Sequence, residues 1–201
     1  MNIKEMKEAA NLLVAEWDLG KKESGAKGNI CAWIYLFEIL AESEKIITYK
    51  EKNKLIGFCG YSKKNSNRSL FRKKIYKLTR KILFNSKVIK NKDALEKYYD
   101  NYDYLPKELE NKYDGEITIL IVNNNYRGKG IGKELLFQTF ESAKKDNIKK
   151  ICILSDESCS YEFYEKCGCR NIYETNIYNK EKSKLGTNLV EKAFVYQKEL
   201  M

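Results

Sequence analysis

Apolar residues recur at two spacings along the 201-residue chain, and these spacings predict where helices and strands lie. Met6, Ala10, Leu13 and Trp17 are three or four residues apart, which predicts a helix over residues 3–18. The same reasoning predicts helices over 30–41, 130–146 and 159–167, and strands over 46–50, 55–61, 116–123, 149–154, 170–178 and 190–199. The order predicts one α/β domain, residues 1–201, whose mixed, mostly antiparallel central sheet is flanked by helices.

Residues 62–114 interrupt this pattern and are divided by charge. From 63 to 92 there are 12 Lys or Arg and no Asp or Glu, and Phe71, Ile75, Leu78 and Ile82 form one apolar face. We therefore expect a basic amphipathic helix. Residues 93–114 carry seven Asp or Glu and three Lys, interleaved with tyrosines. We expect the segment to be a mostly helical insertion. Four interpretations remain open: a hairpin whose oppositely charged halves attract each other, a lid over a bound acceptor substrate, a surface for a partner, or a nucleic-acid-binding arm.

Composition narrows the protein class. Hydrophobic residues make up 43% and charged residues 33%, which is typical of a globular protein. No apolar run approaches the ~20 residues that span a bilayer, and residues 1–6 lack the apolar core of a signal peptide. We expect a cytoplasmic protein without a membrane partner. The net charge of +10 would suit CoA or a nucleic acid, but a chain rich in Lys, Asn and Ile acquires such a charge from composition alone, so we do not expect a nucleic-acid partner.

The chain has no histidine and six cysteines, none of them in a Cys-x-x-Cys pair. We therefore expect no metal site, and Ser-His or Cys-His nucleophilic catalysis is excluded. Proton transfer must fall to Glu, Asp, Tyr, Lys, Cys or water. The cysteines are expected to be reduced, and most of them to be small core residues.

The stretch from Arg127 to Lys133, Arg-Gly-Lys-Gly-Ile-Gly-Lys, lies between a predicted strand and a predicted helix. A tight glycine turn that opens a helix presents several backbone N–H groups to one point, where the helix dipole adds partial positive charge. Arg127, Lys129 and Lys133 surround the turn with full charges. The pattern predicts a phosphate or pyrophosphate site.

Three phosphate-binding motifs are distinguished by particular residues of this turn. A Walker A loop would need Gly at 127 and a hydroxyl at 134, where the chain has Arg127 and Glu134, and a Rossmann loop would need Gly at 133, where it has Lys133. The pattern Arg/Gln-x-x-Gly-x-Gly/Ala is met by Arg127, Gly130 and Gly132. The turn therefore resembles the acyl-CoA pyrophosphate loop of the GNAT superfamily of N-acyltransferases.

A second segment strengthens the resemblance to the GNAT superfamily. Residues 160–169, Ser-Tyr-Glu-Phe-Tyr-Glu-Lys-Cys-Gly-Cys, resemble the family's Ala-x-x-Phe-Tyr-Glu-Lys-x-Gly-Phe, and residues 193–198 resemble its last strand. The chain departs from the family at Glu157, Ser160 and Cys169, where the family has Asn, Ala and Phe. The resemblance covers residues 116–199 well, residues 1–61 in outline, and residues 62–114 not at all.

The resemblance implies a GNAT-like fold, acetyl-CoA as acyl donor and a set of contacts to it. The pantetheine arm would lie where the strand ending at Val122 parts from the strand over 149–154. Tyr164 would be the general acid that protonates the leaving thiolate, since a phenol of pKa ~10 is matched to a thiol of pKa ~8.5. The implied CoA-binding residues are Ile121, Val122, Arg127, Gly128, Lys129, Gly130, Ile131, Gly132, Lys133, Ser160 and Phe163.

Three other residues are candidates for chemistry. Glu116, 11 residues before Arg127, stands where some family members place a general base, although Asp114-Gly115-Glu116 also reads as an exposed turn. Water is the alternative base, and Glu157 is a reserve. Cys159, near the predicted start of a helix, would be an acyl carrier only if transfer to the amine were indirect.

These residues predict direct transfer of an acetyl group from acetyl-CoA to an amine. The acidic, tyrosine-rich stretch within 93–114 favours a small cationic amine over a protein as acceptor. The alternative is a non-catalytic, CoA-responsive or nucleic-acid-binding module that uses the basic helix, 63–92. The sequence leaves the identity of the amine, the length of the acyl group and the oligomeric state open.

Overall fold

The structure is a computed structural model that describes residues 1–17, 26–66, 70–85, 109, 112–157, 159–178 and 190–200. The chain divides into two compact units. The first comprises Met1–Lys90 and Ile117–Asn147, and the second comprises Asn91–Glu116 and Ile148–Met201.

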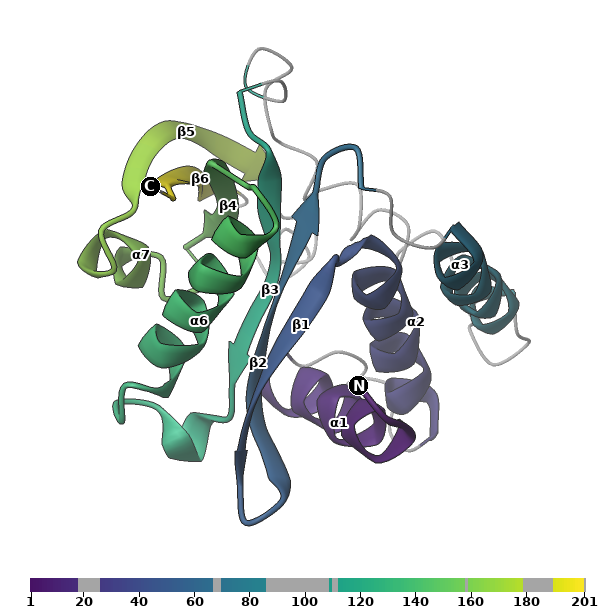
Figure 1. Ribbon diagram of the computed structural model, residues 1–201. Helices are drawn as coiled ribbons and strands as arrows, with labels where there is room; N and C mark the ends of the chain where they lie inside the picture. Colours follow the sequence, from purple (N-terminus) through teal and green to yellow (C-terminus); the bar gives the residue numbers. More distant parts are fainter. Residues whose placement is uncertain are drawn as a thin grey trace. The chain divides into compact units, whose positions relative to one another are not determined.

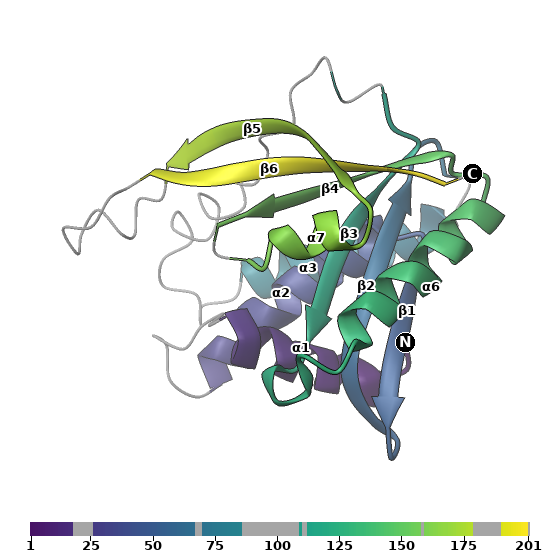
Figure 2. The same ribbon diagram turned by 90° about the vertical axis from the view of Figure 1, so that its left-hand side faces the viewer.

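The first unit is a three-stranded layer in the order β1-β2-β3, with helices on both faces (Figures 1 and 2). Helices α1 and α2 cover one face, and α6 covers the other. Its elements are α1 (Ile3–Trp17), α2 (Ala26–Glu42), β1 (Lys45–Glu51), β2 (Lys54–Lys63), α3 (Leu70–Phe84), β3 (Gly115–Val122), the 3₁₀ turn η1 (Asn124–Tyr126) and α6 (Ile131–Lys145).

Local sequence explains how these elements begin and turn. The side chain of Asn2 accepts a hydrogen bond from the Glu5 amide at 3.0 Å, and the Glu5 carboxylate accepts one from the Asn2 amide at 2.7 Å. This reciprocal capping box starts α1. Lys52 and Asn53, with φ of 48° and 62°, form the two-residue turn that joins antiparallel β1 and β2.

The core of the first unit forms where the apolar stripes of the helices meet β2. Leu13 of α1, Ile34 of α2 and Leu135 of α6 are fully buried, as is Phe58 of β2. Each of these side chains stabilises the fold by roughly 1.5–3 kcal/mol relative to an exposed position. The same packing holds the end of β3 and the start of α6, which carry the glycine turn.

The second unit contains three antiparallel strands in the order β4-β6-β5 and one short helix. These are β4 (Lys150–Asp156), α7 (Glu162–Lys166), β5 (Arg170–Tyr178) and β6 (Val190–Glu199). Tyr113, Cys152 and Val195 form a buried cluster between them. One carboxylate oxygen of Asp114 accepts hydrogen bonds from the amides of Lys149 and Lys150, each at 3.0 Å, which fixes the start of β4.

The predicted class is confirmed: the fold is mixed α/β, with mostly antiparallel strands and flanking helices. The helix expected over 30–41 is longer than predicted, because α2 begins at Ala26 and includes Gly28. The expected helix over 159–167 shortens to the five residues of α7. Most cysteines are core residues as predicted, with Cys59, Cys152, Cys167 and Cys169 buried.

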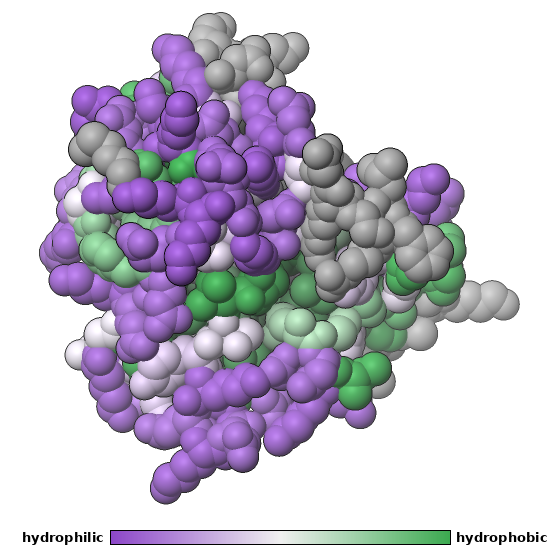
Figure 3. Space-filling view, in the orientation of Figure 1, coloured by the Kyte–Doolittle hydropathy of each residue, from purple (hydrophilic) through white to green (hydrophobic). Residues whose placement is uncertain are grey.

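The insertion between β2 and β3 is described in part. The predicted basic amphipathic helix exists as α3, and the strands that the insertion joins, β2 and β3, are neighbours. Residues 86–108, which hold most of the acidic half, lie outside the described residues, and so does the side chain of Phe71. The predicted apolar face of α3 is largely exposed at its described members: Ile75, Leu78 and Ile82 are 45%, 60% and 63% exposed. Figure 3 shows apolar surface beside hydrophilic surface at the right-hand edge, where α3 lies in Figure 1.

Helix α3 is held to α2 by its other side. The rings of Tyr76 and Phe37 are 5.9 Å apart, and Arg80 forms an ion pair with Glu38 at 3.2 Å. Burial raises the pKa of Glu38, and Arg80 opposes that shift. Within the described ranges, no helix is long and apolar enough to cross a membrane.

Candidate active site

The glycine turn leads from β3 through η1 into α6. Gly128 and Gly130 have φ of 76° and 81°, the left-handed region that favours glycine, and Gly130 is the N-cap of α6. A Cβ added to either glycine would meet no atom within 4 Å. The space in front of the turn is therefore open to a ligand.

The turn also offers hydrogen-bond donors and positive charge. No partner among the described residues accepts a hydrogen bond from the amides of Gly128 to Lys133, whereas the Glu134 amide bonds to the Gly130 carbonyl at 3.0 Å and begins the regular helix. The ammonium groups of Lys129 and Lys133 lie 4.8 and 5.8 Å from the ring centroids of Tyr126 and Phe137. Unpaired amides, a helix N-terminus and two lysines together suit a phosphate or pyrophosphate.

Arg127 is engaged inside the protein, although its side chain is 54% exposed. Its Nη2 donates to a Glu16 carboxylate oxygen at 2.7 Å, and its Nε donates to the Val122 carbonyl at 3.3 Å. Arg127 thus braces the backbone of the turn. Because its guanidinium already donates to Glu16 and Val122, Arg127 has fewer hydrogen-bond donors left for a ligand than the motif predicts. The other cations of the turn are Lys129 and Lys133.

The end of β3 carries the two residues predicted to contact pantetheine. Ile121 is buried and Val122 is half-buried. A Cβ at Gly57 of β2 would lie 2.7 Å from the Ile121 carbonyl oxygen and 3.1 Å from a Leu135 methyl, so glycine is required for this approach of β2, β3 and α6.

Tyr164 lies in α7 of the second unit and is half-buried. Its ring centroid is 5.4 Å from those of both Phe163 and Tyr196. Burial, reinforced by the charge of Glu165, raises the pKa of Tyr196 to about 12, so this neighbour stays neutral near pH 7. The aromatic packing fixes the position of Tyr164 and leaves Tyr196 unsuited to give up a proton.

Glu157, Cys159 and Ser160 lie in the connection between β4 and α7. The Cys159 amide donates to the Asp156 carbonyl at 3.0 Å. The prediction that a helix begins near Cys159 is wrong, because α7 begins at Glu162. One oxygen of Glu157 accepts from the Lys192 amide at 2.9 Å, which gives that carboxylate a structural task. Ser160 is exposed, and its carbonyl accepts the Phe163 amide at 3.0 Å.

Two carboxylates lie on strands. Glu116 is half-buried in β3, and strand alternation places it on the same side as Thr118. Its predicted exposed-turn alternative does not hold, because β3 begins at Gly115. Asp156, at the end of β4, is 1% exposed.

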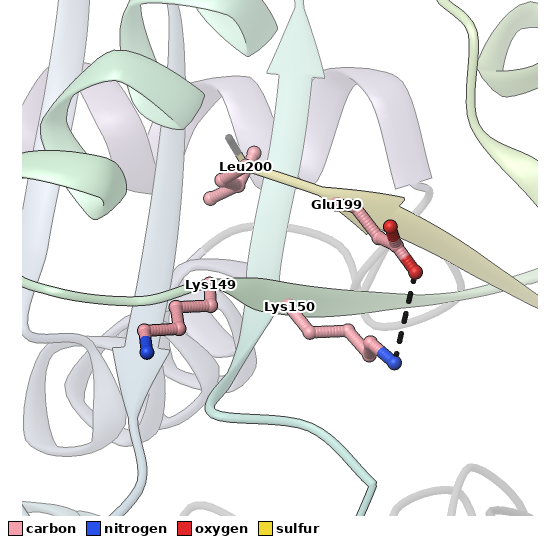
Figure 4. A pocket seen from close by; sticks show the side chains of 4 residues that line it. All are labelled: Lys149, Lys150, Glu199 and Leu200. Atoms are coloured by element: carbon pink, nitrogen blue, oxygen red, sulfur yellow. Dashed lines mark ion pairs between the residues drawn. The ribbon is translucent and has the colours of Figure 1, made fainter.

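A surface pocket at the start of β4 and the end of β6 is lined by Lys149, Lys150, Glu199 and Leu200 (Figure 4). Lys150 forms an ion pair with Glu199 there at 3.7 Å. The residues of the second motif follow the opposite end of β4, so this pocket contains none of the candidate site residues. A group of three or more His, Cys, Asp or Glu side chains able to hold a metal is not found in the described part of the chain.

The structure groups the predicted site residues in two sets. Residues 121–133 lie together at the end of β3 and the start of α6, and residues 160–164 lie together before and within α7. Comparison with known proteins gives both sets a family context. The chain matches the Acetyltransferase (GNAT) family over residues 11–169, and no curated protein sequence matches it. The protein therefore belongs to the GNAT acetyltransferase family.

Solved structures share its fold at low sequence identity. PH1933 from Pyrococcus horikoshii is 16% identical, with a TM-score of 0.59 over 100% of this chain and 94% of that one. An aminoglycoside 6'-N-acetyltransferase complexed with coenzyme A is 13% identical, with a TM-score of 0.58 over 100% and 93%. A Bacillus anthracis protein assigned as a streptothricin acetyltransferase, solved with acetyl coenzyme A, is 20% identical with a TM-score of 0.44. The match covers 77% of this chain, which spans 61% of the length of that protein. The TM-scores of 0.59 and 0.58 show a shared fold, and the GNAT assignment rests on the family match over residues 11–169.

Proposed function

We propose that the protein is an N-acetyltransferase that moves an acetyl group from acetyl-CoA directly to an amine. The open, amide-lined turn from Gly128 to Lys133 carries this proposal, because it suits the pyrophosphate of CoA. Membership of the GNAT family and the CoA complex of the aminoglycoside 6'-N-acetyltransferase support it.

The reaction breaks one bond and forms another. The neutral amine nitrogen attacks the thioester carbonyl carbon, a C–N bond forms, and the C–S bond of acetyl-CoA breaks. Tyr164 donates its phenol proton to the departing thiolate, and the amine gives up a proton to Glu116 or to water. The products are the acetylated amine and CoA with a free thiol, so the reaction needs neither a metal nor an oxidant.

Glu116 is proposed as the base because a half-buried carboxylate at the start of β3 can accept a proton directly or through water. Glu116→Gln should slow turnover mainly below the pKa of the acceptor amine, where that amine is protonated. Raising the pH should partly restore the rate, which a pH profile of kcat/KM measures. A pH-independent loss would remove Glu116 from the role of base.

A small cationic amine is the proposed acceptor. Tyr161 stacks on Phe194 with ring centroids 4.4 Å apart, and Phe194 lies 6.2 Å from Tyr196. Glu162, Glu165 and Glu174 add negative charge around these rings. Phe194 and Tyr196 are buried and Tyr161 is half-buried, so the face available beside these carboxylates is that of Tyr161, and such a face attracts ammonium groups. The aminoglycoside acetyltransferase neighbours fit such an acceptor.

Replacing Tyr164 tests the proposed mechanism. Tyr164→Phe removes one hydroxyl and keeps the ring contacts with Phe163 and Tyr196. Where chemistry limits the rate, kcat should fall by about 10²–10⁴-fold, while the Kd of CoA changes little. Tyr173→Phe, an exposed tyrosine on β5, is the matched control and should leave kcat unchanged. An unchanged kcat in Tyr164→Phe would exclude Tyr164 as the general acid.

A second candidate function follows from α3. Its exposed residues include Lys74, Lys77 and Lys81, so the helix is a basic surface that a nucleic acid would attract. As a binding module the protein would bind DNA or RNA with an affinity that falls steeply with salt, and Lys77→Gln with Lys81→Gln would reduce the salt dependence. Binding that stays weak at low salt would reject this function.

A further inference from the structure

Glu16 lies in the last turn of α1, and both of its carboxylate oxygens bond to the chain that enters the glycine turn. Its side chain is 3% exposed. One oxygen accepts the Asn124 amide at 2.9 Å, and the other accepts Arg127 Nη2 at 2.7 Å. A carboxylate buried to this extent is costly to desolvate and needs such partners.

The helix end that carries Glu16 is itself fixed. The neighbouring residue, Trp17, packs edge-on against Tyr35 of α2, with ring centroids 5.6 Å apart. Arg127 completes a bridge, because it bonds both to Glu16 and to the Val122 carbonyl. The chain from the end of β3 to Arg127 is therefore tied to α1.

Besides Glu16, two other contacts hold this segment: the Asn123 amide donates to the Ile56 carbonyl of β2 at 2.9 Å, and the Tyr126 side chain hydrogen-bonds Glu51 of β1. Its other bonds are local. The Asn123 side chain accepts the Asn125 amide at 3.0 Å, and the Arg127 amide donates to the Asn124 carbonyl at 3.2 Å. These local bonds shape η1. Glu16 is the anchor to α1, and it alone holds both the Asn124 amide and the Arg127 side chain, directly before the amides from Gly128 onward that have no described partner.

We propose that Glu16 is a positioning residue for CoA: it holds the turn in the shape that binds the pyrophosphate without touching the ligand. This inference rests on the proposed function. It explains why a carboxylate stands so near an anion-binding turn. The Arg127 guanidinium and the Asn124 amide compensate its charge, and in return it fixes the direction in which the turn's amides point.

For Glu16→Gln the proposal predicts weaker CoA binding, whereas simple electrostatics predicts stronger CoA binding. Glu16→Gln removes a negative charge near a polyanionic ligand, so charge alone would strengthen CoA binding. Loss of positioning would weaken CoA binding, because the glutamine side chain cannot form the ion pair with Arg127 and the turn loses its anchor to α1. We expect the Kd of CoA to rise about tenfold, the usual consequence of losing one charged hydrogen bond.

Two comparisons separate positioning from general destabilisation. Pantetheine lacks the pyrophosphate, so its Kd should be unchanged in Glu16→Gln. Glu8→Gln is the matched control, because Glu8 also lies on α1 and accepts a backbone amide, that of Leu55 at 2.9 Å, away from the turn. This control should bind CoA as the wild type does.

The experiment measures Kd by titration calorimetry for CoA and pantetheine, with folding checked by circular dichroism. Arg127→Gln and the double variant complete a mutant cycle, in which the double variant should bind CoA no more weakly than the weaker single one. Unchanged or tighter CoA binding in Glu16→Gln would overturn the positioning role while leaving the proposed function intact. An equal loss for pantetheine would also overturn it, whereas a wild-type protein that binds no CoA would refute both.

Discussion

Gly128 and Gly130 decide what the turn before α6 can bind. Their positive φ values turn the chain sharply, and the absence of side chains leaves the space in front of the amides open. Any other residue at Gly130 would both strain the backbone and place a side chain in the open space that we propose for the pyrophosphate. The two effects are separable by experiment.

Gly130→Val should abolish CoA binding at concentrations that saturate the wild type, while the protein stays folded. A non-glycine residue at this φ costs about 1–2 kcal/mol, which a folded domain tolerates. Gly168→Val is the strain control, since Gly168 has a φ of 75° but lies beyond α7. Calorimetric Kd values and thermal unfolding curves make the comparison. A folded Gly130→Val protein with normal CoA affinity would disprove the site.

At the scale of elements, the C-terminal end of α6 is tied to β1 and β2 by Asp146. Its two oxygens accept from Tyr61 at 2.6 Å and from Lys45 at 2.8 Å, and its carbonyl accepts Lys63 at 2.6 Å. Burial alone would raise the pKa of Asp146, but the hydrogen bonds from Lys45 and Tyr61 outweigh it and hold that pKa below its ordinary value of 3.8. The ionised form thus stabilises the packing of α6.

Asp146→Asn should lower the free energy of unfolding by about 1–2 kcal/mol near pH 7. A depressed carboxyl pKa contributes stability that is present above the unfolded-state pKa and is lost as the pH falls through the lower folded-state pKa. The difference from the wild type should therefore be constant above about pH 5 and shrink below about pH 4. Urea denaturation across this range measures it, with Glu141→Gln as an exposed control on the same helix. A difference that persists unchanged in acid would contradict the linkage.

The apolar face of α3 should contribute little to stability. Ile75, Leu78 and Ile82 remain largely exposed, so replacing all three with Ser should change the free energy of unfolding by less than about 1 kcal/mol. Ile34→Ala, at a fully buried position of α2, should cost about 2–5 kcal/mol in the same urea titration. A large loss in the triple variant would show that this face is covered in solution.

Local pattern predicts most elements of this chain but not their tertiary contacts. The helix expected over 130–146 is observed as Ile131–Lys145, because its apolar spacing and glycine N-terminus are local signals. The start of α2 was missed, since Gly28 disfavours a helix and the helix includes it nonetheless. Periodicity in α3 identified an apolar face but carries no information on what covers it.

The same limit applies to the site. The glycine pattern and the residues around Tyr164 are contiguous in sequence, so both sets were predictable by motif. Glu16 was not, because it is 111 residues from Arg127 and no local pattern marks the pair.

At the scale of the whole molecule, a GNAT fold, an anion-binding turn and a positioned tyrosine together support one activity. The net charge of +10 neither supports nor opposes this activity, since residues 63–92, with 12 Lys or Arg and no Asp or Glu, carry the excess of positive charge and contain none of the candidate site residues. The turn and the tyrosine can each be tested by a substitution, but only a turnover assay tests the activity that they produce together.

The most direct measurement incubates the wild-type protein with acetyl-CoA and a panel of amines, from a simple alkylamine to an aminoglycoside. Free CoA thiol is followed by absorbance, and the acetylated amine by mass spectrometry. We predict that at least one cationic amine yields thiol and acetylated product in equal amounts, and that both fall sharply in Tyr164→Phe. Tight CoA binding without thiol release above the amine-free background, for every amine tested, would contradict the proposal that this protein transfers an acetyl group from acetyl-CoA to an amine.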